Sequence, residues 1–88
     1  MFSFLKHPRK RYLYAIITGD YCGQMLALVE SENTNYQFLV LPTIENRAID
    51  KQKFKFALDN KIVEPVERLP KNIYNFLVEQ YKYNKCNK

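Results

Sequence analysis

The chain has 88 residues, of which 47% are hydrophobic and 15% aromatic, and its formal net charge is +5. This length allows one domain with a single core, and the apolar content excludes an intrinsically disordered chain. No apolar run reaches the ~18 residues of a membrane span, and apolar residues precede the first bases, the reverse of a secretory signal. We therefore expect a cytoplasmic protein, with Cys22 and Cys86 as free thiols because two cysteines make no disulfide framework.

The positive charge is concentrated at the two ends. Residues 1–11 carry four bases and no acid, and residues 82–88 carry three bases and no acid. The other seven of the 14 bases share the interior with all nine acids. We expect a basic N-terminal arm over 1–11, one domain over 12–83 and a basic tail over 84–88. If the two ends lie close together, as domain termini often do, they form one basic patch.

The N-terminal arm allows two interpretations. Phe2 and Phe4 could pack against the core and leave the basic run after Pro8 in solvent, or that run could bind nucleic acid or an acidic partner. His7 is the only histidine, and no cysteine, aspartate or second histidine stands at a spacing typical of a metal or catalytic site.

Three apolar runs of strand length follow, over residues 13–18, 24–29 and 36–41. The two glycines of the chain, Gly19 and Gly23, bracket the first turn, where glycine can adopt a positive φ without a Cβ clash. We expect Asn33 and Asn35 to serve the second turn, because asparagine tolerates the left-handed region. The short connections predict an antiparallel meander with residues 25–31 in the middle.

Both faces of this predicted sheet are apolar. An antiparallel sheet with one solvated face should alternate apolar with polar residues, and these runs do not. A helix, the N-terminal arm or a partner must therefore cover the second face.

The next segment is less regular. Residues 43–48 are polar and predict a loop. Asp50 suits a helix N-cap and Asn60 a left-handed stop, which predicts a helix of one to two turns between them. Phe54 and Phe56 alternate along the chain, however, and would also suit a strand.

A strand and a helix are predicted to complete the domain. Residues 62–67 suit a strand, and Pro65, which cannot donate to the ladder, places it at an edge or a bulge. Pro70 suits the first position of a helix that we expect to end near Lys82. Its apolar residues recur with the helical period and predict one buried stripe: Ile73, Tyr74, Phe76, Leu77, Val78 and Tyr81.

The segment Ile17-Thr-Gly-Asp-Tyr-Cys-Gly-Gln24 resembles the strand–turn–strand centre of KOW-type SH3-like barrels, in which a glycine-flanked turn carries an aromatic residue. The chain departs from that pattern at Asp20, where the family has a basic residue, and lacks its further glycines. The resemblance implies a small curved barrel that often binds RNA or protein, with Tyr21 as the exposed aromatic residue. We expect a mainly β or α+β fold: an antiparallel meander of four to five strands in an SH3-like barrel or half-barrel, with a short helical turn and a C-terminal helix packed on the sheet.

The sequence contains no phosphate loop, zinc-ligand spacing, nucleophile elbow or paired carboxylate motif. We therefore expect no catalytic, cofactor or metal site, no small-molecule substrate and no membrane contact. The predicted function is that of a non-enzymatic binding module.

Two kinds of partner fit this module. The first is a protein, either a host protein or a second copy, because a sheet with two apolar faces and one good helix leaves apolar surface. The chain also looks like small uncharacterised bacteriophage proteins, which commonly bind host or virion proteins. The alternative is RNA or DNA, with exposed tyrosines stacking on bases and the basic ends neutralising phosphates. The residues that we expect to contact either partner are Arg9, Lys10, Arg11, Tyr21, Lys82 and Lys85.

Overall fold

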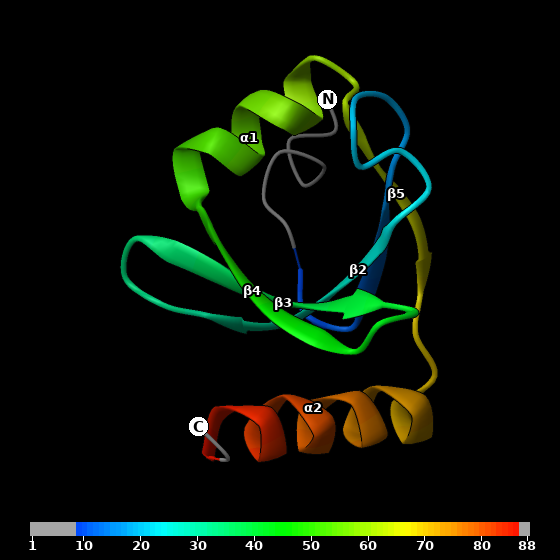
Figure 1. Ribbon diagram of the computed structural model, residues 1–88, viewed down its shortest axis with the longest axis vertical. Coiled ribbons are helices and arrows are strands. Elements are labelled where there is room, and N and C mark those ends of the chain that lie inside the picture. The colour runs from blue at the N-terminus through cyan, green and yellow to red at the C-terminus, as the bar shows by residue number, and fades with distance from the viewer. Residues whose placement is uncertain (1–8, 87–88) are drawn as a thin grey trace.

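The computed structural model describes residues 9–86, so the predictions for the arm before Arg9 and for Lys88 lie outside the described residues. Its elements are, in chain order, β1 (Tyr12–Ile16), β2 (Met25–Ser31), β3 (Asn35–Leu41), β4 (Glu45–Asp50), α1 (Lys51–Asp59), β5 (Val63–Arg68) and α2 (Lys71–Cys86). The strands form one antiparallel sheet in the order β4-β3-β2-β1-β5. The sheet is curved and open, with α1 on its concave side and α2 beneath its other face (Figure 1). The predicted α+β fold, an antiparallel meander that forms a half-barrel, is confirmed.

Both faces of the sheet carry a hydrophobic core, as the two-faced pattern predicts. On the concave face, residues of four strands surround Phe54 from α1: Tyr14, Leu26, Leu28, Phe38, Val40 and Val63. On the opposite face, Leu77 and Tyr81 from α2 pack against side chains of β1, β2 and β3 and of the segment after β5: Leu13, Ala27, Val29, Leu39 and Leu69. Two helices of the same chain therefore cover the two faces, and the sheet needs no partner to be buried.

Strand β4 was not predicted. The segment that we expected to be a loop pairs with β3 without interruption, from Asn35 opposite Asp50 to Val40 opposite Glu45. The strand lies at the edge of the sheet, and none of its residues is fully buried. An edge strand of this kind needs no apolar alternation, because its pairing to β3 supplies the structure. Hydrophobic periodicity therefore cannot reveal it.

The caps of α1 confirm one prediction and correct another. The Asp50 carboxylate accepts hydrogen bonds from the N–H groups of Gln52 and Lys53, at 2.8 and 3.2 Å, as expected of an N-cap. Asn60, however, has φ −98° and is not left-handed. The left-handed residue is Lys61, with φ 58°. The side chain of Asn60 instead donates to the Phe56 carbonyl, at 2.9 Å.

Lys61 lies in a Schellman motif that usually has glycine at this position. Its N–H donates to the Leu58 carbonyl at 3.2 Å, and the next N–H, of Ile62, donates to the Ala57 carbonyl at 2.8 Å. We expect Lys61→Gly to raise the free energy of unfolding by about 1 kcal/mol, because it removes the steric penalty of a Cβ atom in the left-handed region. Urea denaturation measures this change, and Lys61→Ala, which keeps the Cβ atom, should show no such gain.

The turns between the first three strands follow the prediction in part. Gly19 and Gly23 both have positive φ, of 93° and 100°. Neither Asn33 nor Asn35 has a positive φ, and Asn35 already belongs to β3, so that expectation was wrong. The second turn is closed instead by a backbone hydrogen bond of 2.8 Å from the Glu32 N–H to the Asn35 carbonyl. Pairing of the flanking strands holds this turn without left-handed backbone at either asparagine.

The C-terminal half matches the prediction for β5 more closely than for α2. Strand β5 is the other edge of the sheet, and its register to β1 shifts next to Pro65, so it has both the edge and the irregularity that a proline favours. Helix α2 continues to Cys86, beyond the expected end at Lys82 and into the segment that we expected to be a tail. Two members of its predicted buried stripe, Ile73 and Phe76, are instead 45% and 53% exposed.

Candidate functional site

The three predicted basic residues before β1 differ in exposure. Arg9 and Lys10 are exposed, whereas Arg11 is half-buried. The Arg11 carbonyl accepts a hydrogen bond of 2.6 Å from the Leu69 N–H, and its guanidinium donates to the Leu69 carbonyl at 3.2 Å. Arg11 thus joins the start of β1 to the segment that leads into α2, and this structural contact occupies part of its side chain.

The C-terminal bases lie at the other end of α2. A rise of 1.5 Å per residue places Lys85 about 21 Å along the helix from Lys71, which follows the Arg11 contact. The ammonium group of Lys85 is 3.8 Å from the Glu32 carboxylate and 5.5 Å from the centre of the Tyr81 ring. The described bases at the two ends of the domain therefore do not form one patch.

Tyr21, the expected exposed aromatic residue, is 58% exposed in the glycine-flanked turn. The guanidinium of Arg47 lies 5.2 Å from the centre of its ring and also donates to the Gln24 side chain, at 3.0 Å. No local motif marks Arg47 in the sequence, because only the meander brings β4 beside the first turn. The contact links this turn to β4.

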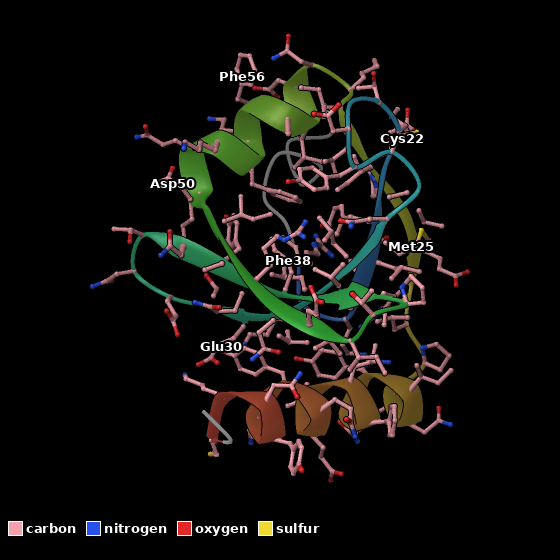
Figure 2. All side chains as sticks on the ribbon, in the orientation of Figure 1. Cys22, Met25, Glu30, Phe38, Asp50 and Phe56 are labelled. Atoms are coloured by element: carbon pink, nitrogen blue, oxygen red, sulfur yellow. The ribbon has the colours of Figure 1, made fainter. Side chains whose placement is uncertain are left out.

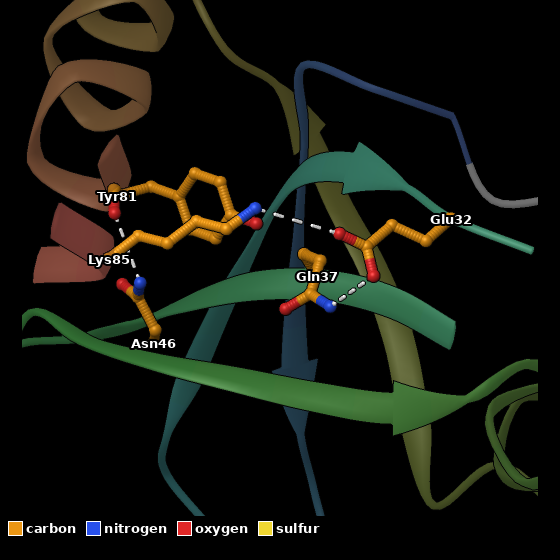
Figure 3. Close-up of polar contacts among 5 residues, drawn as sticks. All are labelled: Glu32, Gln37, Asn46, Tyr81 and Lys85. Atoms are coloured by element: carbon orange, nitrogen blue, oxygen red, sulfur yellow. Dashed lines mark hydrogen bonds and ion pairs between the residues drawn. The ribbon is translucent and has the colours of Figure 1, made fainter. Parts of the chain in front are cut away.

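A polar hollow of about 320 Å³ separates the end of α2 from β3 and β4. Figure 3 shows that Lys85 and Tyr81 reach it from the helix, while Glu32 and Gln37 come from the hairpin of β2 and β3. The Gln37 amide donates to Glu32 at 2.9 Å, and the Asn46 amide donates to the Tyr81 carbonyl at 3.0 Å. The Asn46 bond and the ion pair between Lys85 and Glu32 fasten the end of α2 to the sheet.

The pKa of the Tyr81 phenol is raised, first because it is buried and then because it hydrogen-bonds to the Glu30 carboxylate; the nearby Lys85 opposes the shift. Burial is also the main reason why the pKa of Tyr14 and that of Tyr74 are raised. The pKa of Lys85 is raised by its contact with the Tyr81 hydroxyl and by the Glu30 carboxylate. Figure 2 shows Glu30 between the sheet and α2, where it faces this network.

These raised phenol pKa values predict a loss of stability in alkali. An unfolded tyrosine ionises near pH 10, whereas the folded environment favours the neutral form, so the stabilisation is complete below that pH. It is lost as the pH rises from the unfolded pKa through the raised folded pKa. We expect urea denaturation between about pH 9 and 11 to show falling stability, and Tyr81→Phe to make the fall shallower. Tyr83→Phe, an exposed position on the same helix, is the matched control, and an unchanged slope in Tyr81→Phe would contradict the assignment.

Large apolar side chains remain exposed along one side of α2. Ile73, Phe76 and Tyr83 are 45%, 53% and 63% exposed. At 3.6 residues per turn these three positions fall within about 80° of one another around the helix axis. We call these three residues the α2 apolar flank. Near the C-terminal end of α2, Asn84 donates to the carbonyl of Ile44, a further exposed apolar residue, at 3.0 Å, so the β3–β4 turn contacts the helix there.

Comparison with protein-family models, with curated proteins and with solved structures finds no match to this chain. In the described part of the chain, no helix combines the length and apolarity needed to cross a membrane. Among residues 9–86, no three histidine, cysteine, aspartate or glutamate residues are grouped so that they could hold a metal ion. Cys22 and Cys86 are exposed free cysteines, as expected.

Proposed function

We propose that the protein is a non-enzymatic binding module that contacts another protein through the α2 apolar flank. The observation that carries this proposal is the exposure of Ile73, Phe76 and Tyr83 on a helix that covers the sheet with another of its sides. Aromatic and branched apolar side chains grouped on one surface are typical of the anchors that bury themselves at protein interfaces. Because these side chains are already exposed, a partner can bind them without a change in the fold, which suits an adaptor.

Nucleic-acid binding is the weaker alternative. Arg11 and Lys85 lie near opposite ends of α2, and Lys85 is paired with Glu32. A continuous basic groove, which would track a phosphate backbone, needs cations that line one surface. Tyr21 is exposed enough to stack on a base, but its near cation, Arg47, also hydrogen-bonds to Gln24.

Affinity capture from a lysate of the source cells tests the proposal, with and without nuclease. The immobilised protein is compared with a Phe76→Asp/Tyr83→Asp variant and with Phe56→Asp, a charge at a residue of α1 that is 62% exposed. We expect a protein that is retained by the unsubstituted chain and by Phe56→Asp but lost from the α2 variant, with no effect of nuclease. Equal retention by all three chains would refute a role for the flank. Retention that nuclease abolishes would favour nucleic acid instead.

A further inference from the structure

The two edges of the sheet are protected to different degrees. Strand β5 has two devices that discourage another strand from pairing, namely Pro65 and an irregular register to β1. Strand β4 contains no proline, and its six residues pair with β3 in one unbroken register. Figure 1 shows β4 as the end of the sheet nearest the viewer. Within residues 9–86, its outer side pairs with no other strand.

The backbone of β4 alternates between inward and outward groups. The Lys51 N–H donates to the Thr34 carbonyl at 2.9 Å, which continues the β3–β4 ladder by one pair. In an antiparallel ladder, hydrogen-bonded pairs alternate with pairs that are not hydrogen-bonded. The backbone N–H and C=O groups of the odd-numbered residues of β4 therefore point toward β3. The N–H and C=O groups of Asn46 and Ala48, and the N–H group of Asp50, consequently point to the free edge, where they form a template for an added strand; the Asp50 carbonyl, as that of an N-cap, belongs to α1.

Three hollows follow β4 from end to end. The first, of about 310 Å³, includes Glu45 and Asn46; the second is the polar hollow beside Ala48; the third, of about 280 Å³, includes Asp50. Alternate residues of a strand point to the same face and are separated by roughly 6.7 Å. An extended chain alongside β4 would therefore place every second side chain next to these hollows. Of the described residues that line the first hollow, only Glu45 is charged, whereas acids and bases share the other two.

We propose that β4 is a docking edge for an extended segment of another protein, which adds to the sheet as a sixth strand. The added strand takes its backbone hydrogen bonds from Asn46, Ala48 and Asp50, and its alternate side chains are polar, with a lysine or arginine opposite Glu45. This inference rests on the proposed protein-binding function but uses a surface distinct from the α2 apolar flank. Strand addition of this kind draws affinity from the main chain and specificity from alternate side chains.

A tethered strand tests the proposal without knowledge of the natural partner. Asn84, near the end of α2, bonds to both Ile44 and Asn46, so a flexible linker appended to the C-terminus can reach β4 from this end of the helix. The tail consists of about ten glycine and serine residues followed by seven residues of alternating threonine and lysine, which gives a millimolar effective concentration. The control tail has proline in place of each threonine and cannot form the ladder.

Amide hydrogen exchange measured by NMR reports the pairing. We expect the amides of Asn46, Ala48 and Asp50 to exchange at least about tenfold more slowly with the threonine–lysine tail than with the proline tail. Ala48→Pro, which removes an outward donor, should abolish this protection, and Glu45→Gln should reduce it. Should Ala48→Pro fail to fold, the comparison of the two tails still decides the outcome.

Equal exchange rates with the two tails would overturn the proposal, as would protection confined to β5. Protection in the untailed protein that grows with protein concentration would identify a second copy as the occupant and would likewise overturn the assignment. Phe76→Asp in the tailed protein should leave the protection unchanged, so the result is independent of whether the α2 apolar flank binds a partner.

Discussion

Replacing Phe54 with alanine should lower the free energy of unfolding by about 3–5 kcal/mol. Phe54 is 1% exposed and is the only fully buried residue of α1. Its ring centre lies 4.8 Å from that of Phe38, 5.3 Å from that of Tyr14 and 5.8 Å from that of Tyr36. Truncation would leave a cavity in this aromatic cluster and would release the helix from the concave face. A domain of this size has about 5–15 kcal/mol of stability, so the loss is a large fraction of the total.

Phe56→Ala is the matched control for Phe54. Phe56 is the same residue type on the same helix, but it is 62% exposed and lies on the outer side of α1, whereas Phe38 points into the concave side (Figure 2). Its truncation should change stability by no more than about 0.5 kcal/mol. Urea denaturation followed by circular dichroism measures both variants, and Phe54→Leu gives a smaller loss if the alanine variant does not fold. Similar losses at Phe54 and Phe56 would contradict the placement of α1.

The second large effect is expected at Leu77, where alanine should lower the free energy of unfolding by about 2–5 kcal/mol. Leu77 is 5% exposed and packs with Tyr81 against the face of the sheet that carries Leu39. Without the Leu77 side chain, α2 loses a central contact with the strands that it covers. The helix would remain attached by polar contacts at its end, among them the bond from Asn46 to the Tyr81 carbonyl. The loss should therefore be smaller than the total free energy of unfolding, and the variant should still fold.

Phe76→Ala provides the comparison for Leu77 at the adjacent position. The sequence pattern places both residues in one buried stripe, whereas the structure leaves Phe76 53% exposed. Its truncation should therefore change stability by less than about 0.5 kcal/mol, although it should weaken partner binding if the α2 apolar flank is the interface. Thermal and urea denaturation of the two single variants would distinguish the two positions. A larger loss of stability at Phe76 than at Leu77 would contradict the orientation of α2 described above.

The cores of the two sheet faces show why some features could be predicted locally. Leu26 and Leu28 belong to one core, and Ala27 and Val29 to the other, because successive residues of a strand point to opposite faces. Apolar residues at every position of the strand therefore require two covered faces. The N-cap at Asp50 was predictable for the same kind of reason, since a carboxylate oxygen reaches the nearest free N–H groups of the helix.

The candidate binding surfaces depend on longer-range relations. The period of α2 predicts an apolar stripe, but this stripe is wider than the surface that the sheet can bury, and packing leaves Ile73 and Phe76 exposed. The contact between Tyr21 and Arg47 joins residues from β4 and a distant turn. Neither property is encoded in the spacing of neighbouring residues.

The sequence by itself determined the antiparallel meander, the two apolar faces of its strands, the glycine-bracketed turn and the N-cap of α1. These features depend on side-chain alternation, backbone freedom and contacts within a few residues, all of which are local. Only the tertiary structure decided that β4 exists as an edge strand, that α1 and α2 cover opposite faces, and which side of α2 stays in solvent. The physical reason is that pairing to β3 and burial against the sheet supply the free energy for these outcomes, and both depend on residues far apart in the chain.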